Sequence, residues 1–156
     1  PTSAARVKVE AADNIFFNIS LPNFTITAAT NSPPTLLTDG NTNRAIALDS
    51  VTFLREPFPL ATLLNFSADQ RTRIMLFATG LELMPGESIS VVTAQAEDSA
   101  HRIYPLTVEY VGKVPGFDWL TQLNVRLADG LAGTGDLLVS VSVRGAVSNK
   151  VIVRIQ

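Results

Sequence analysis

The clearest pattern of hydrophobic and polar positions lies near the carboxyl terminus, from Asp136 to Gln156. Every odd position from 137 to 143 is leucine or valine, and Ser140 and Ser142 stand between them. After a turn around Gly145, the odd positions from 151 to 155 are again valine or isoleucine. Because successive side chains of a β-strand point to opposite faces, this period of two predicts a strand, a turn and a second strand.

Strand-like segments recur along the whole chain, separated by turn formers such as Pro85-Gly86 and Asp129-Gly130. Helix signals are weak, so an all-β fold of the immunoglobulin-like sandwich type is expected. Pro105 cannot donate a ladder hydrogen bond, so its segment is expected to be an edge strand or to be broken there. The expected strands before the terminal pair cover Arg6–Glu10, Ile15–Leu21, Phe24–Ala28, Ala45–Leu54, Arg73–Thr79, Ser88–Ala96, Ile103–Val111 and Gln122–Leu127.

A polar stretch rich in turn formers divides the chain between residues 30 and 44. The seven strand-like segments that follow it are enough for an immunoglobulin-like sandwich. We therefore expect an amino-terminal strand extension with a linker at residues 1–38, and the sandwich at residues 39–156. The strands of the extension are apolar and surplus to a minimal sandwich, so they need a surface on which to bury their side chains.

Several segments carry a resemblance to a known family. Residues 114–117 read Val-Pro-Gly-Phe, residues 121–127 read Thr-Gln-Leu-Asn-Val-Arg-Leu, and residues 143–151 read Val-Arg-Gly-Ala-Val-Ser-Asn-Lys-Val. With Gly135-Asp136, Ala45–Phe58 and Asn65–Leu83, they make residues 39–156 resemble the carboxy-terminal immunoglobulin-like domain of secreted and surface proteins of Acidobacteria. The last of these segments, in which a glycine and then Ser-Asn come before an alternating strand, is shared with the IPT/TIG domains of plexins and transcription factors. The resemblance implies an extracellular β-sandwich without catalytic residues.

The composition narrows the classes of function. Charged residues make up 17% of the chain, the net charge is −2, and the 12 lysines and arginines are scattered. Nucleic-acid binding needs clustered positive charge, so no nucleic-acid partner is expected. The chain has no cysteine, which excludes disulfides, thiolate metal sites and cysteine nucleophiles. No apolar run approaches the ~20 residues of a transmembrane helix, so no membrane span is expected.

The chain begins at Pro1, which fits a mature secreted chain whose signal peptide has been removed, or an excised fragment. We expect the former and place the protein outside the cell or at the cell surface. The low share of charged residues, below the usual ~25%, agrees with this, because extracellular β proteins often carry serine, threonine, asparagine and glutamine on their surface.

Catalytic chemistry has little support in the sequence. His101 is the single histidine, and a Ser-His-Asp system would have to use it. It follows the polar residues 97–100, so we expect an exposed loop histidine. Sequence motifs of serine hydrolases, zinc proteases and phosphate-binding loops are missing. We therefore expect a protein that is not an enzyme.

Asp39, Asn41 and Asn43 place oxygen side chains at alternate positions, as calcium loops do. Arg44 stands where such a loop has glycine, and Ser50 occupies the position of its final glutamate. Aspartate, asparagine and glycine also form ordinary turns. These three side chains are the calcium candidate of the chain, and no other cofactor is expected.

Phe117 and Trp119 follow the turn at Pro115-Gly116. Exposed aromatic rings can stack on sugars, so the two residues are a candidate carbohydrate contact. The alternative is that Trp119 caps the core at one end of the sandwich, because its ring has a large apolar area. Of these two interpretations, we favour the capping role.

The amino-terminal segment suggests a way of assembly. Sheet edges carry unpaired N–H and C=O groups, to which a segment of another subunit can add as a strand. Repeated head to tail, such a contact does not close and yields a filament. We expect a self-assembling surface filament subunit of this kind, with strand pairing inside the chain as the alternative. A binding or adhesion module is the second function considered. The side chains expected at the intersubunit strand are Val7, Val9, Ile15, Phe17, Ile19 and Leu21.

Overall fold

The computed structural model describes residues 2–5, 8–10, 17–19, 24–26 and 32–156, and it divides the chain into two compact units, Pro1–Thr30 and Asn31–Gln156. In the first unit, β1 (Thr2–Ala5) pairs antiparallel with β4 (Phe24–Ile26). Inside that pair along the sequence, β2 (Lys8–Glu10) pairs antiparallel with β3 (Phe17–Ile19). We call this nested arrangement the amino-terminal hairpin.

The strands expected to be donated to a neighbour are therefore paired within their own chain. Val9 lies opposite Asn18, and the neighbouring register places Phe17 opposite Glu10. Ile19 ends β3. Val7, Ile15 and Leu21 lie outside the described residues.

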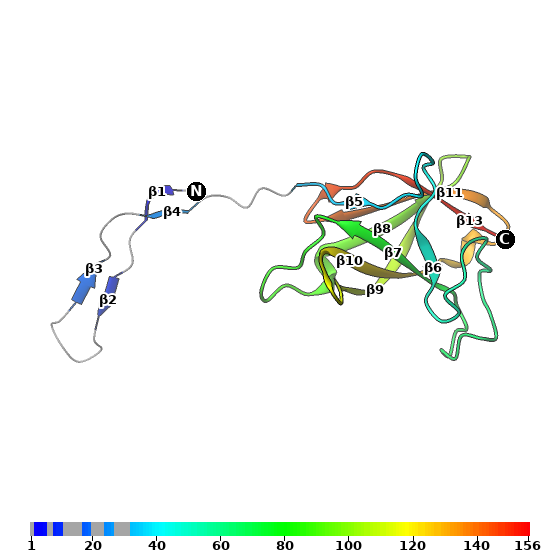
Figure 1. The fold of residues 1–156 in the computed structure, drawn as a ribbon, viewed down its shortest axis with the longest axis horizontal. Helices are drawn as coiled ribbons and strands as arrows, with labels where there is room; N and C mark the ends of the chain where they lie inside the picture. Colours follow the sequence, from blue (N-terminus) through cyan, green and yellow to red (C-terminus); the bar gives the residue numbers. More distant parts are fainter. Residues whose placement is uncertain (1, 6–7, 11–16, 20–23, 27–31) are drawn as a thin grey trace. The chain divides into compact units, whose positions relative to one another are not determined.

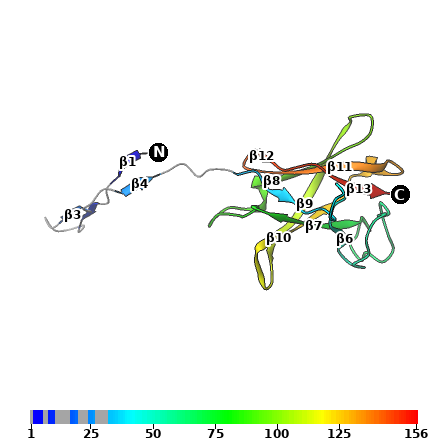
Figure 2. The ribbon, with the colours of Figure 1, turned by 45° about the horizontal axis from the view of Figure 1, so that its top comes forward.

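The second unit is all-β apart from two short 3₁₀ helices, as the alternating pattern predicted (Figure 1). Its sheet is antiparallel throughout the named strands and curls so that its two halves form layers (Figure 2). The elements are β5 (Thr35–Leu36), β6 (Ala47–Asp49), β7 (Arg73–Thr79), η1 (Ile89–Val91), β8 (Val92–Glu97), β9 (Ile103–Val114), β10 (Phe117–Arg126), η2 (Asp129–Leu131), β11 (Gly135–Val143), β12 (Ala146–Val147) and β13 (Val151–Ile155).

The strand order matches that of immunoglobulin-like sandwiches, with β5 and β6, β7, β10 and β9 in one half, and β9, β8, β11 and β13 in the other. β9 belongs to both halves. Residues 103–106 pair with β8, and the pairing with β10 begins at Thr107. Pro105 lies in the first stretch, opposite Gln95, where β8 is the one strand that pairs with β9. The expectation of an edge position at Pro105 is therefore confirmed.

The core lies between the two halves and is built by the alternating residues of the strands. Val139, Val141 and Val143 of β11 are buried, and so are Val151 and Val153 of β13. Burying one such side chain stabilises a fold by about 1.5–3 kcal/mol, so the alternation supplies the main driving force for folding. The opposite half contributes Leu36, Ile74, Leu76, Ala78, Leu123 and Val125 to the same cluster.

The side of the sandwich next to β13 is closed by pieces of chain that are too short to be strands. Arg44 and Phe58 form parallel bridges to Ile152 and Ile155 of β13. The side-chain amide of Asn149 accepts a hydrogen bond from the Leu36 N–H at 2.8 Å and donates one to the Leu36 C=O at 3.1 Å. Because Leu36 also pairs with Ala78, the second unit begins before residue 39, where the sequence placed the boundary.

The strand register defines two ends of the sandwich. Thr35 of β5 lies opposite Thr79, the last residue of β7, and we call this the β5 end. Asp49 of β6 lies opposite Ile74, next to Arg73 at the start of β7, and we call this the loop end. The long segment between β6 and β7 and the carboxyl terminus lie at the loop end (Figure 1). The seven residues of β7 separate the two ends by ~20 Å.

Candidate functional site

The most exposed large apolar side chains of the second unit gather in the segment between β6 and β7. Leu63 is 80% exposed and Phe66 is 93% exposed, and four neighbours are between 41% and 66% exposed. Scattered exposed apolar residues are normal on a protein surface, but a contiguous group marks an interaction site. We call this group the loop patch; it consists of Val51, Phe53, Leu54, Leu63, Leu64 and Phe66.

Buried polar side chains hold the backbone of the loop patch. The Asp49 carboxylate is buried and accepts hydrogen bonds from the N–H groups of Val51 and Thr52, both at 2.8 Å. Phe53 adopts the left-handed conformation, with φ at 59°, which is uncommon for a bulky residue. Asn65 is also buried; its amide donates to the Arg71 C=O and accepts from the Ser67 N–H. The exposed apolar side chains therefore stand on a backbone with defined hydrogen bonds.

A cavity of about 230 Å³ opens within the loop patch. Leu54 and Leu64 line it from two parts of the segment that are ten residues apart, so both parts of the patch meet at one hollow. Phe58 lines it as well, and it is 1% exposed and belongs to the core. The remaining lining consists of Pro57 and Pro59, the charged residues Asp49 and Arg55, and the polar residues Thr52, Thr62 and Gln156. The volume would hold one or two large apolar side chains.

Charged side chains flank the loop patch. Arg73 contacts Asp69 at 2.6 Å and Glu109 at 2.9 Å, and Arg126 contacts Asp69 at 2.9 Å. Hydrogen bonds from Arg73, then Arg126 and Ser67, hold the pKa of the Asp69 carboxyl well below its ordinary value. These residues form an ion-pair network that ties the end of the segment to β9 and β10. A patch with an apolar centre and a polar rim is typical of protein interfaces.

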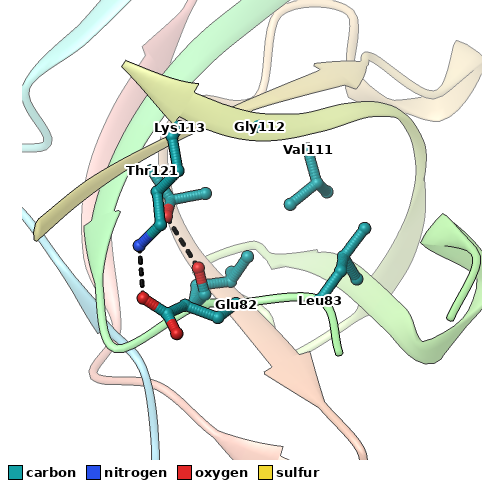
Figure 3. A pocket seen from close by; sticks show the side chains of 7 residues that line it. Glu82, Leu83, Val111, Gly112, Lys113 and Thr121 are labelled. Atoms are coloured by element: carbon teal, nitrogen blue, oxygen red, sulfur yellow. Dashed lines mark hydrogen bonds and ion pairs between the residues drawn. The ribbon is translucent and has the colours of Figure 1, made fainter. Parts of the chain in front are cut away.

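A second hollow, of about 240 Å³, lies at the β5 end (Figure 3). Val111 and Leu83 project toward it from opposite sides, and the Thr121 hydroxyl donates to the Leu81 C=O at 2.6 Å. Lys113 and Glu82 form an ion pair at its mouth, and the hydrogen bond from Lys113 lowers the pKa of the Glu82 carboxyl. The hollow has an apolar floor and a charged rim. It is better suited to binding an apolar side chain than to catalysing a reaction.

Phe117 and Trp119 lie beside this hollow at the start of β10, where the register with β9 shifts between Phe117 and Thr121. Their rings meet edge to face, with centroids 6.1 Å apart and an interplanar angle of 87°. Phe117 is 51% exposed and Trp119 is 59% exposed. The expectation that Trp119 caps the core is therefore wrong, because its side chain is exposed and is not part of the buried core cluster. Their role as a ligand contact stays a prediction.

His101 is exposed, as expected, with 86% of its side chain accessible. Its Nδ1 lies 2.6 Å from Oε1 of Glu97, and Glu97 also forms an ion pair with Lys150. In the same turn, hydrogen bonds from the Arg102 N–H, and then from its guanidinium and the Tyr104 hydroxyl, lower the pKa of Asp98 to about 2. The arrangement is an ion-pair network that holds the turn between β8 and β9.

The calcium candidates lie in a loop that closes with ordinary hairpin contacts. Thr38 and Ala45 form an antiparallel bridge, and the Thr42 N–H donates to the Asp39 C=O at 3.0 Å. The C=O of Asn43 accepts from the Ile152 N–H. The Asp39 carboxylate lies 3.8 Å from the Arg55 guanidinium. Asn41 belongs to the same turn, and calcium binding here stays a prediction. Among the described residues, no three His, Cys, Asp or Glu side chains gather as metal ligands do.

Sequence reasoning missed the loop patch. Residues 51–54 continue the apolar character of β6, and they were expected to extend that strand to Leu54. The strand ends at Asp49 because its carboxylate binds the next N–H groups and turns the chain. The available signal was an apolar, proline-containing stretch at residues 57–66 that fits neither the period of a strand nor that of a helix.

Comparison with known proteins found no matching family model, no matching curated protein and no matching solved structure. Within the described part of the chain, no helix has the length and apolar character needed to cross a membrane.

Proposed function

We propose that this protein is a non-enzymatic extracellular structural protein, whose subunits join head to tail into a surface filament through the amino-terminal hairpin. The observation that carries the proposal is that residues 1–30 form a compact unit of their own, made of two strand pairs. A two-stranded hairpin is only marginally stable alone in water, and units below ~40 residues usually need a partner or a cross-link. The chain has no cysteine for a cross-link, so the hairpin needs a partner surface.

The amino acids of the hairpin support an apolar partner. Between residues 14 and 30 the sequence has no Asp, Glu, Lys or Arg. The same stretch contains several large apolar residues, among them Phe17, Ile19, Phe24 and Ile26. Burial of such residues releases about 25 cal/mol for each Å² removed from water, so association through this stretch is favoured.

The pairing inside the hairpin changes how a subunit would join its neighbour. Each strand of a hairpin keeps one open edge, so the hairpin can add to a neighbouring sheet or cover an apolar surface as a two-stranded element. A contact between different surfaces of identical subunits does not close on itself, which favours a filament. The resemblance to surface domains of Acidobacteria supports the location outside the cell.

Removal of residues 1–30 tests the proposal. We expect filaments from the full chain and dispersed particles from the shortened chain, by negative-stain microscopy and sedimentation velocity. The buried core runs from Leu36 to Ile155, so the shortened chain should keep a cooperative thermal transition, which circular dichroism checks. Filaments from the shortened chain that match those of the full chain would contradict the proposal. A full chain that stays monomeric at every concentration would also do so.

The exposure of Phe117 and Trp119 favours a second function, binding of carbohydrate at the β5 end. Aromatic rings that stand free at the surface can stack on the faces of sugar rings, and the charged pair Glu82–Lys113 offers hydrogen-bonding groups nearby. Affinity electrophoresis in soluble polysaccharides tests this function. Retardation that Trp119→Ala abolishes and Val147→Ala, at another exposed apolar residue, leaves intact would support it; equal mobility in every gel would exclude it for those polysaccharides.

A further inference from the structure

We infer that the loop patch receives the amino-terminal hairpin of a second copy of this chain. The inference rests on the proposed function and adds the receiving surface to it. Three observations carry it: the apolar stretches in both partners, the distance between the patch and the point where the chain enters the sheet, and the hollow within the patch.

A long stretch of each partner carries no charged residue. Residues 57–68 contain no Asp, Glu, Lys or Arg, and neither do residues 14–30 of the hairpin. An apolar surface of this kind gains little from a charged or strongly polar ligand, because such a ligand would lose its hydration without compensation. Docking of residues 14–30, which are rich in phenylalanine and isoleucine, removes no charged side chain from water, and the charged residues of the hairpin (Arg6, Lys8, Glu10 and Asp13) lie outside that stretch.

The strand register puts the loop patch and the point where the chain enters the sheet at opposite ends of the sandwich. The chain leaves the hairpin unit and joins the sheet at Thr35, opposite Thr79 at the β5 end. The loop patch lies in the segment between Asp49 and Arg73 at the loop end. A donor that enters at one end and a receiver at the other give a head-to-tail contact, and repetition of that contact extends a filament without limit.

The hollow of about 230 Å³ gives the patch the shape of a receptor. Leu54 and Leu64 stand at its sides and the core residue Phe58 forms part of its wall. The hydrogen bonds of Asp49 and Asn65 hold its loops in place before any partner arrives. Preorganisation of this kind lowers the entropic loss on binding.

Introduction of negative charge into the loop patch of the full chain tests the inference. In Leu63→Asp/Phe66→Asp, both changed side chains are exposed, so the fold should persist while filaments are lost. The matched control is Phe117→Asp/Trp119→Asp, which adds the same charge at the exposed aromatic pair of the β5 end and should leave filaments intact. Filaments from the loop-patch variant, together with their loss on removal of residues 1–30, would overturn this inference and leave the proposed function standing. Loss of filaments in the control alone would move the receiving surface to the β5 end.

Disulfide trapping separates a second copy from the same chain, because the natural chain offers a background free of cysteine. A chain with Ile19→Cys is mixed with a longer, tagged chain that carries Leu64→Cys, and the pair is oxidised. We expect a disulfide-linked product with the summed mass of both chains, and no such product when Thr93→Cys on β8 replaces Leu64→Cys. A chain with both Ile19→Cys and Leu64→Cys that closes an internal disulfide at high dilution would overturn the inference, because the hairpin would then cover its own patch.

Discussion

Two turns at the loop end are built in the same way and display opposite surfaces. In each, a buried aspartate accepts hydrogen bonds from N–H groups that follow it: Asp49 binds those of Val51 and Thr52, and Asp98 binds those of Ala100 and Arg102. In each, one residue adopts the left-handed conformation, Phe53 with φ at 59° and His101 with φ at 60°. The first turn presents Phe53 and Leu54 to solvent, whereas the second presents His101 and Arg102.

The side chains that such a turn presents to solvent are therefore independent of how the turn is built. An aspartate turn needs its carboxylate and its backbone, and it accepts histidine and arginine outside as well as phenylalanine and leucine. Folding therefore does not explain the apolar side chains of the first turn. A surface contact does explain them, because exposed apolar side chains contribute favourable free energy only when a partner removes them from water.

The largest expected effect is a difference in the free energy of unfolding between variants at a buried and an exposed apolar residue of the same segment. Phe58→Ala should lower the free energy of unfolding by about 3–5 kcal/mol, because it removes a ring from the core. Leu63→Ser, at a position five residues further on, should change it by less than about 0.5 kcal/mol, because that side chain is already in water. Urea unfolding followed by circular dichroism measures both. Surface substitutions usually change the free energy of unfolding by less than about 0.5 kcal/mol. A loss well above that limit in Leu63→Ser would show that the loop patch stabilises the fold.

The next effect is the dependence of stability on pH at Asp98, in the turn between β8 and β9. The pKa of Asp98 is lowered from 3.8 to about 2, chiefly by the Arg102 N–H. A carboxyl with a lowered pKa stabilises the fold above its ordinary pKa, and this contribution disappears as the pH falls through the lowered value. Asp98→Asn should therefore melt at a lower temperature than the natural chain at pH 7. The gap should narrow between about pH 4 and 2. A gap of constant size down to pH 2 would show that the charge of Asp98 contributes nothing.

The smallest expected effect compares the two left-handed residues. The left-handed conformation costs an L-residue about 1–2 kcal/mol, and glycine adopts it without a clash, at an entropic loss of roughly 0.5–1 kcal/mol on folding. Phe53→Gly should thus leave stability unchanged or raise it by up to about 1 kcal/mol, while it weakens assembly. His101→Gly should gain less, because it loses the contact with Glu97, and it should assemble normally. Calorimetry measures the stability of each variant, and light scattering measures its assembly. Equal assembly of both variants would show that Phe53 is not part of the interface.

The fold could be predicted from the sequence where the pattern of apolar residues is local. The sequence assigned β7 to Arg73–Thr79, and the structure has the same limits, because a short apolar run between the polar residues Arg73 and Thr79 is typical of a strand that is buried between neighbours. The start of β10 was placed five residues late, because Asp118 and Trp119 interrupt the alternation where the register with β9 shifts. The bridges from Arg44 and Phe58 to β13 join residues that are about 100 positions apart in the chain, and a single sequence gives no signal for such contacts.

The candidate site was less predictable than the fold. Phe117 and Trp119 could be chosen as unusual residues, yet their exposure depends on the register shift and not on their identity. The loop patch escaped notice because its residues are those expected inside a protein. Whether an apolar side chain faces the core or the solvent in an irregular segment is decided by turns such as the one at Asp49, which hydrophobic pattern does not reveal.

The amide of Asn149 has a mechanical consequence. It holds both backbone groups of Leu36, beside the point where the chain joins the sheet, while β5 pairs with β7 on its other side. Tension applied to the chain before Thr35 is therefore divided at once between the two sheet halves, through β7 in one and the segment next to β13 in the other. In a thread of linked subunits, load would pass through the body of each sandwich and would not peel off its first strand.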